Sequence, residues 1–235
     1  MKTYGQFCPL AQAAQLLCER WTLIIVRELT AGSTRFGELQ KGAPLLSPAL
    51  LSARLKQLRK AGVVVQRGAP GSPTYHLTAA GRALRPIVEA FGIWGHHWVP
   101  SALGDDDLDA KLLMWDMRRS VDPAVFPERR VVLQFAYPDA AAGAQHWWLV
   151  SEHREIDLCL TDPGYEVDLL IRCPLKTMTE VWTCKCSFDD AVRARRIDVK
   201  GDAALARKLQ SFLRASALAR LGERTPVSRL DTVAG

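Results

Sequence analysis

The sequence lacks the patterns that would place it in a membrane, outside the cell or around a zinc ion. No stretch of the 235 residues approaches about 18 uninterrupted apolar positions, so no membrane span is expected. No apolar run follows Met1-Lys2-Thr3, which predicts no secretory signal. The six cysteines include no Cys-X-X-Cys pair and lack the spacing of a zinc site. Together these absences predict a cytoplasmic protein with reduced thiols.

Catalytic patterns are missing as well. The sequence has no glycine-rich phosphate loop, and no nucleophile, base and orienting residue at a recognisable spacing. Cys184 and Cys186 would face the same way on a strand, but no histidine or further cysteine completes a metal set. The three aspartates at residues 105–107 are better explained as a solvated linker. We therefore expect no enzyme activity, no metal and no cofactor.

Basic charge is present, but in one half of the chain. Residues 1–100 contain 12 Lys and Arg against 4 Asp and Glu, whereas residues 101–235 contain 19 against 21. The net charge of +6 therefore comes entirely from the first half. A hydrophobic content of 48% is enough for one large core or two small ones. The asymmetry indicates a polyanionic partner for the first half, most plainly nucleic acid.

Residues 47–62 predict a short helix with an apolar face and a basic face. Ser47 suits the N-cap, Pro48 the first turn and Gly62 the end. At the helical period one face is entirely leucine: Leu51, Leu55 and Leu58. The opposite face is small and then basic: Ala49, Ser52, Ala53, Lys56 and Lys60. Alone, this is equally an ordinary amphipathic helix or a helix that enters a nucleic-acid groove.

The segments around this helix favour the second interpretation. Helical patterns precede it at residues 10–17, 21–29 and 34–39. After Gly62 the pattern becomes β-branched, with two strands expected at residues 63–67 and 74–77. Helices followed by a two-stranded ribbon outline a winged helix-turn-helix. A long helix is then expected from Thr78 to about Trp98, with a kink or break at Pro86.

Residues 6–98 carry short segments in a characteristic order and spacing. They include Cys8-Pro9-Leu10, Glu19-Arg20-Trp21, Arg35-Phe36-Gly37-Glu38-Leu39, Leu51-Ser52-Ala53-Arg54-Leu55 and Tyr75-His76-Leu77-Thr78. In this order they resemble the HxlR family of bacterial winged-helix transcription regulators. The resemblance implies binding to double-stranded operator DNA as a homodimer, with the first and last helices of the domain forming the dimer contact.

Three groups of residues are then predicted to contact DNA. The base-proximal set lies on the recognition helix: Ser47, Ala49, Ser52, Ala53 and Lys56. Arg59 and Lys60 are predicted to meet phosphate, and Thr34 and Arg35 to hold the backbone. The wing tip at residues 68–73 is neutral and leaves Arg67 at its base, so base reading by the wing is not expected.

Cys8 has two interpretations. The resemblance implies that a cysteine near this place could sense oxidants or electrophiles, because a helix N-terminus can favour the reactive thiolate. The alternative is a packing residue of the family. Cys18 is expected in the core.

Beyond a polar, acidic linker at residues 100–109, the pattern predicts a second domain of the α+β class at residues 110–220. Its strands are expected at residues 131–137, 146–150, 156–160 and 167–173. Its helices are expected near residues 111–119, 177–183, 189–195 and 203–213. Residues 1–100 would form the winged helix domain, and residues 221–235 a disordered tail.

Three segments of the second half carry a further resemblance: Val167-Asp168-Leu169-Leu170-Ile171, Leu175-Lys176-Thr177-Met178-Thr179-Glu180-Val181-Trp182 and Ile197-Asp198-Val199-Lys200-Gly201-Asp202. They are similar to sterol carrier protein type 2-like domains, which place helices against a curved sheet around an apolar tunnel. The side chains that would supply core or tunnel are Trp115, Met117, Phe135, Trp147, Trp148, Leu158, Leu160, Leu169, Ile171 and Trp182. The sequence does not divide core from tunnel.

The sequence thus predicts a DNA-binding, homodimeric transcription regulator whose second domain senses an apolar small-molecule effector. Two alternatives stay open. One is a regulator that responds to oxidants or electrophiles through Cys8. The other is a lipid or apolar-ligand binding module whose winged domain mainly dimerises.

Overall fold

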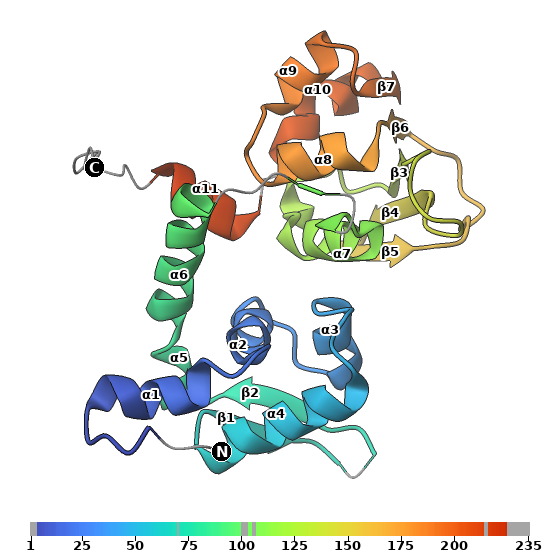
Figure 1. Ribbon diagram of the computed structural model, residues 1–235. Helices are drawn as coiled ribbons and strands as arrows, with labels where there is room; N and C mark the ends of the chain where they lie inside the picture. The colour runs from blue at the N-terminus through green and yellow to red at the C-terminus, as the bar shows by residue number, and fades with distance from the viewer. Residues whose placement is uncertain (1–3, 70, 100–102, 105–106, 214–215, 225–235) are drawn as a thin grey trace, which may run out of the picture. The chain divides into compact units, whose positions relative to one another are not determined.

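A computed structural model describes residues 4–69, 71–99, 103–104, 107–213 and 216–224 (Figure 1). The chain divides into two compact units, Met1–Phe91 and Gly92–Gly235. Residues 100–102 and 105–106 of the expected linker, and residues 225–235 of the expected tail, lie outside the described residues. The domain boundaries expected from the sequence stay a prediction. None of the described helices is long and apolar enough to cross a membrane.

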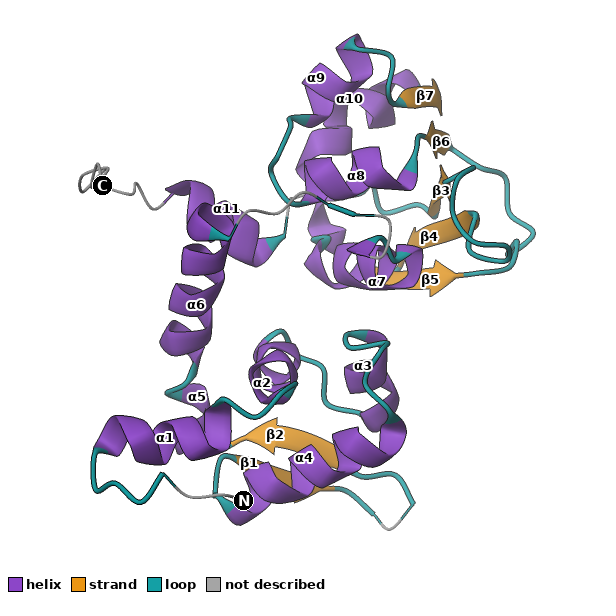
Figure 2. Cartoon of the chain, in the orientation of Figure 1, coloured by secondary structure: helices purple, strands orange, loops and turns teal. Residues whose placement is uncertain are grey.

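The first unit has the element order of a winged helix-turn-helix (Figure 2). Its helices and strands are α1 (Pro9–Leu17), α2 (Thr22–Thr30), α3 (Phe36–Lys41), α4 (Pro48–Lys60), β1 (Val64–Arg67), β2 (Thr74–Leu77), α5 (Ala79–Arg82) and the start of α6 (Arg85–Trp98). The long helix expected after Thr78 is broken into α5 and α6. Pro86 lies in the first turn of α6, where its missing N–H costs no hydrogen bond. The expected break is confirmed.

The core of the first unit forms around the leucine face of α4. Leu51, Leu55 and Leu58 are buried against Ile25 and Val26 of α2. The periodicity therefore identified the buried face of this helix correctly. Cys18, expected in the core, is exposed instead. It follows the last residue of α1, a helix with no fully buried side chain, so the core does not extend to it.

A two-stranded ribbon closes this unit. β1 pairs antiparallel with β2, from Val64 opposite Leu77 to Arg67 opposite Thr74. The ribbon is tied back to the helices, because Tyr75 N donates to Thr34 O at 2.7 Å and Arg35 forms an isolated bridge with Thr74. The predicted wing is therefore present and fixed to the segment that begins α3.

The second unit contains a mixed five-stranded sheet in the order β5-β4-β3-β6-β7. Its elements after α6 are α7 (Ala110–Ser120), a short 3-10 helix (Pro123–Val125), β3 (Val131–Ala136), β4 (His146–Glu152), β5 (Glu155–Cys159), β6 (Leu169–Arg172), α8 (Leu175–Trp182), α9 (Phe188–Arg193), β7 (Asp198–Gly201), α10 (Ala203–Phe212) and α11 (Ala217–Arg224). β3 pairs parallel with β6, and the other pairings are antiparallel. The α+β class is confirmed, whereas β7 and α11 were not expected.

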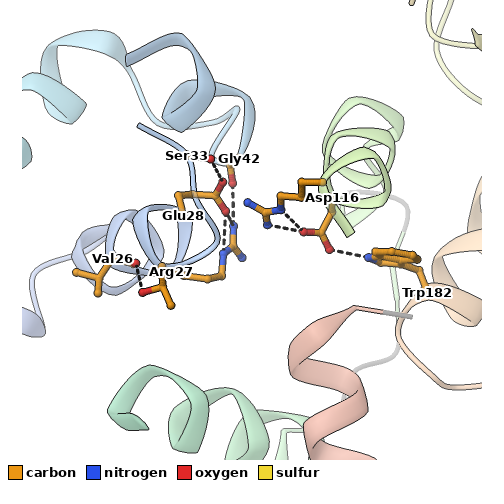
Figure 3. A network of polar contacts seen from close by, with 9 residues as sticks. Val26, Arg27, Glu28, Ser33, Gly42, Asp116 and Trp182 are labelled. Atoms are coloured by element: carbon orange, nitrogen blue, oxygen red, sulfur yellow. Dashed lines mark hydrogen bonds and ion pairs between the residues drawn. The ribbon is translucent and has the colours of Figure 1, made fainter. Parts of the chain in front are cut away.

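Helices α7 to α10 cover one face of this sheet (Figure 2). The main core lies between them and the strands and includes Met114, Phe135, Trp147 and Leu209. Between α7 and α8, Trp182 Nε1 donates to Asp116 Oδ2 at 2.6 Å, and Arg119 pairs with the other carboxylate oxygen (Figure 3). A buried indole N–H therefore has a partner in the helical layer.

Cys184 and Cys186 do not lie on a strand, so the condition under which they would face the same way is not met. Both residues lie in the connection between α8 and α9, and Cys184 has a φ of +60°. Burial, together with the neighbouring Glu223 carboxylate, raises the pKa of the Cys184 thiol to about 11, so the thiol is neutral near pH 7. Among the described residues, no three His, Cys, Asp or Glu side chains gather into a metal site.

Gly201 ends β7 where two segments of the sheet approach closely. Its φ is +127°, and a Cβ there would lie 2.2 Å from the carbonyl oxygen of Asp168. Asp168 also accepts from Val132 N at 2.8 Å and pairs with Arg129 at 2.6 Å. The absence of a side chain at Gly201 therefore lets β7 meet β6 at its start.

Replacing Gly201 by Ala should destabilise the second unit by about 2–4 kcal/mol, because the new Cβ meets backbone and the φ is unfavourable. Urea unfolding followed by tryptophan fluorescence would measure it. Gly143→Ala is the matched control, since Gly143 has a φ of +77° and no atom within 4 Å of the added Cβ. That control should cost about 1 kcal/mol. Equal losses in the two variants would contradict the steric argument.

Candidate nucleic-acid interface

The recognition helix α4 begins and ends as its sequence predicts. Ser47 is the N-cap, and its hydroxyl accepts from Leu50 N at 3.3 Å. Pro48 occupies the first position, where it lacks only an N–H that has no helical partner. Beyond the C-cap Ala61, Gly62 adopts a φ of +73°, which favours glycine. Ser47 and Gly62 therefore define where the helix begins and ends.

Seven of the side chains predicted to contact DNA are exposed on and beside this helix: Ser47, Ala49, Ser52, Ala53, Lys56, Arg59 and Lys60. On the same helix Leu51, Leu55 and Leu58 are buried. The outward surface is small near the N-terminus of α4 and basic toward its C-terminus. Contact of these residues with DNA stays a prediction.

The remaining predicted residues meet at the ribbon. Arg67 is exposed and lies opposite Thr74 across β1 and β2, while Arg35 bridges to the same Thr74. Thr34 is half-buried, and its backbone N–H donates to Glu38 at 2.8 Å, as that of Arg35 does at 2.9 Å. The backbones of Arg35 and Arg67, two residues predicted separately from the sequence, therefore both pair with Thr74. Sequence spacing could not predict that residues 35 and 67 lie near each other, because their proximity depends on the bridge between Arg35 and Thr74.

Arg54 was not predicted as a functional residue, yet it fixes α4. Its side chain is 12% exposed and donates through three nitrogens: Nη2 to Glu19 Oε2 at 2.7 Å, Nε to Arg20 O at 3.1 Å and Nη1 to Gln57 Oε1 at 2.8 Å. The first two acceptors lie in the turn between α1 and α2. Arg54 therefore ties the recognition helix to this turn and has little capacity left for a phosphate.

The turn that Arg54 holds is itself strained. Trp21 has a φ of +77°, which is unfavourable for a bulky residue. Its ring packs partly on the core, and the Arg20 guanidinium lies 5.3 Å from the ring centroid. Such a conformation persists only where its surroundings determine it. The Arg54 hydrogen bond to Arg20 O is one of the contacts that do so.

A buried ion pair fixes the other side of the helix-turn-helix (Figure 3). The Glu28 side chain is fully buried and pairs with Arg27 Nη2 at 2.7 Å, while Ser33 Oγ donates to it at 3.4 Å. Arg27 Nη2 also donates to Gly42 O at 2.9 Å. A Cβ at Gly42 would lie 1.8 Å from Glu28 Oε2, so only glycine fits there. The sequence predicted a helix over residues 21–29 but did not indicate a role for this carboxylate.

The predicted redox residue Cys8 is exposed at the N-cap of α1, just before Pro9. This position is compatible with a reactive thiol and equally with a packing residue. The sensing role of Cys8 stays a prediction.

The apolar residues that could have lined a tunnel in the second unit are mostly core. Trp115, Met117, Phe135, Trp147, Trp148, Leu169, Ile171 and Trp182 are buried. Leu158 is half-buried and Leu160 exposed. Two surface cavities of this unit, of about 370 and 520 Å³, are instead lined largely by polar and charged side chains together with prolines.

The fold defines a winged helix-turn-helix protein, and comparison with known proteins specifies the family. The HxlR-like helix-turn-helix family matches residues 16–102, and the SCP-2 sterol transfer family matches residues 131–214. The chain belongs to the HxlR family of transcriptional regulators and carries a C-terminal domain of the SCP-2 sterol transfer family.

Individual relatives match the N-terminal part. The uncharacterized HTH-type transcriptional regulator YvaP of Bacillus subtilis is 40% identical over 104 residues, which are 42% of this chain and 96% of that protein. HTH-type transcriptional regulator YodB of the same organism is 33% identical over 91 residues, 37% of this chain and 81% of that protein. The solved structure of reduced YodB is 29% identical and covers 40% of this chain and 97% of its own, with a TM-score of 0.36.

Replacing Arg54 by Ala should weaken DNA binding about tenfold, because α4 loses charge-assisted hydrogen bonds that orient it. The slope of log K against log salt should stay unchanged, because the guanidinium of Arg54 is engaged by Glu19, Arg20 and Gln57. Fluorescence anisotropy at several salt concentrations would measure both quantities. Arg59→Ala is the matched control. It should reduce the magnitude of the slope by about one, the value expected for the loss of one phosphate contact. A slope that falls equally in both variants would contradict the positioning role.

Proposed function

We propose that this regulator binds operator DNA as a homodimer through α4 of each protomer, and that its C-terminal domain senses a small molecule. The observation that carries the DNA-binding role is the outward face of α4, held on one side by Arg54 and on the other by the segment that Glu28 fixes. Membership of a helix-turn-helix regulator family supports the same role.

The face of α4 suits a major groove because its chemistry changes along the helix. Ala49, Ser52 and Ala53 are short, so the first turns can approach base edges closely. Lys56 extends from the next turn, and Arg59 and Lys60 end the helix with two charges that suit phosphates. Arg35 and Arg67 add charge at the ribbon. The neutral wing tip leaves most sequence reading to α4.

The homodimer is supported by an apolar stripe along α6. Ile87, Phe91, Trp94 and Trp98 follow one another at intervals of four, three and four residues, and each is 48–62% exposed. That spacing places them on one helix face, as in a helix–helix seam. Near α1, Phe7 and Leu10 are also exposed, Phe7 by 96%. A second copy would cover both groups, and a two-fold axis would pair with half-sites about one DNA turn apart.

The sensory role of the C-terminal domain is supported by its surface cavities, which could hold a small molecule. The basic charge and the recognition helix lie in the N-terminal half, so this domain is free for a role other than DNA binding. An apolar effector would have to displace side chains that are already packed in the core. The cavities at the surface are accessible without that cost.

The variant Ser52→Ala, Lys56→Ala should bind DNA from upstream of its own gene at least about tenfold more weakly than the parent. The reason is the loss of a hydroxyl and a charge from the groove-facing surface. Gel-shift titration would measure it, with Lys176→Ala, an exposed lysine of α8, as the control. Unchanged retardation of DNA by the double variant would refute the assignment of this face.

Replacing Trp94 by Glu should raise the dimer dissociation constant by at least about tenfold, because a charge would enter the apolar seam. Sedimentation velocity over a range of concentrations would measure it. Leu160→Glu introduces the same charge at an apolar residue that is 49% exposed and lies outside the stripe, so it should leave the association unchanged. Equal behaviour of the two variants would exclude α6 from the interface.

A further inference from the structure

We propose that the cavity of about 370 Å³ in the C-terminal unit binds a small molecule bearing a carboxylate or phosphate group. The inference rests on the proposed function in one respect, namely that the bound anion is the effector of the regulator. Binding itself can be tested without DNA.

Three segments far apart in the sequence build the cavity. They are the turn after β3, the junction of β6 with α8, and the connection from α9 to β7. The lining residues are Pro138, Asp139, Arg172, Cys173, Pro174, Arg195, Arg196 and Asp198. Because β3 pairs with β6 and β6 with β7, the sheet itself holds the three segments together. The cavity therefore belongs to the rigid layer of the domain.

The charges of the cavity do not cancel. Asp139 accepts from Leu175 N with both carboxylate oxygens, at 2.8 and 3.1 Å, and Asp198 pairs with Lys200 at 3.1 Å. Each acid is thus already engaged by a donor that does not line the cavity.

The arginines are engaged to a lesser extent. Arg196 pairs with Glu180 at 3.0 Å. Arg172 and Arg195 are exposed, and their side chains have no hydrogen-bond or ion-pair partner in the part of the chain that the structure describes. Two guanidinium groups with free donors therefore border one small cavity.

This arrangement specifies the chemistry of the ligand. A guanidinium presents paired N–H donors in a plane, which match the oxygens of a carboxylate or phosphate. The volume is in the range of small-molecule sites. An anion in the cavity would balance the positive charges of Arg172 and Arg195.

The remaining wall is neutral. Pro138 and Pro174 offer apolar surface, and Cys173 is buried. Burial raises the pKa of the Cys173 thiol to about 12, so near pH 7 it brings no charge and little nucleophilicity. The ligand is therefore held by non-covalent contacts, with room for a small apolar group beside its anionic one.

The test uses the full chain titrated with sodium benzoate and, separately, inorganic phosphate at constant ionic strength. Arginine Nε–Hε resonances report binding, and benzyl alcohol serves as the uncharged probe. We expect saturable shifts with the two anions and none with the alcohol. Arg172→Gln and Arg195→Gln should each raise the dissociation constant about tenfold. Arg193→Gln, at an exposed arginine paired with Asp190 outside the cavity, should leave it unchanged.

A second arm distinguishes a free anion from a lipid headgroup. Vesicles of phosphatidylglycerol and of phosphatidylcholine are sedimented with the parent and with both variants. Arginine-dependent binding to soluble anions identifies a free ligand, and arginine-dependent binding to phosphatidylglycerol alone identifies a headgroup; both support the anion site. Binding to neither, or binding that survives both substitutions, would overturn it.

Gel shifts with the same variants separate this inference from the proposed function. If Arg172→Gln and Arg195→Gln weaken DNA binding in the absence of any anion, the arginines serve DNA phosphate and the effector site is refuted. If the parent binds benzoate but retards no DNA, the proposed function fails and the anion site stands. Retention of DNA binding by both variants, with loss of anion binding, is the result we expect.

Discussion

The geometry of the DNA-binding unit depends on a carboxylate that has no access to water. Glu28 lies beneath the turn between α3 and α4, and its charge is balanced by Arg27, which also holds the carbonyl of Gly42. Removing one member of such a pair leaves an uncompensated buried charge, which costs about 3–5 kcal/mol. The pair therefore does more than add stability, because it specifies one arrangement of the turn. The position of α4 relative to α2 follows from that arrangement.

Arg54 completes this constraint from the opposite side. It connects α4 to the strained turn between α1 and α2, through the Glu19 carboxylate and the carbonyl of Arg20. The recognition helix is thus held at two places by buried or half-buried polar contacts, while its leucines supply the apolar packing. Hydrophobic burial is non-directional, whereas charge-assisted hydrogen bonds fix an orientation. This division explains how a short helix can present a small set of side chains at a defined angle.

Local periodicity accounts for what the sequence predicted and for what it missed. The leucine face of α4, its Ser47 cap and the break before Pro86 depend on residues within a turn or two of one another, so spacing alone predicted them. The burial of Glu28 depends on Gly42, which lies 14 positions away, and the role of Arg54 depends on Glu19, which lies 35 positions away. Contacts between such distant residues form only when the chain folds. Cys18 is exposed because the core ends before it. β7 was missed because its register depends on pairing with β6, in which Gly201 lies against Asp168.

The helix that carries the proposed dimer stripe also belongs to both units, since the division at Phe91 falls within α6. Within the second unit, α11 packs on the end of α6: His97 Nε2 lies 2.9 Å from Gly222 O, and a Cβ at Gly92 would lie 3.0 Å from Leu218. A ligand that displaced α11 would therefore affect the turns of α6 that bear Trp94 and Trp98. It would regulate DNA binding only if it bound differently to the two states of the dimer. Such a ligand would change DNA binding by changing the geometry of the dimer, with no need to touch α4.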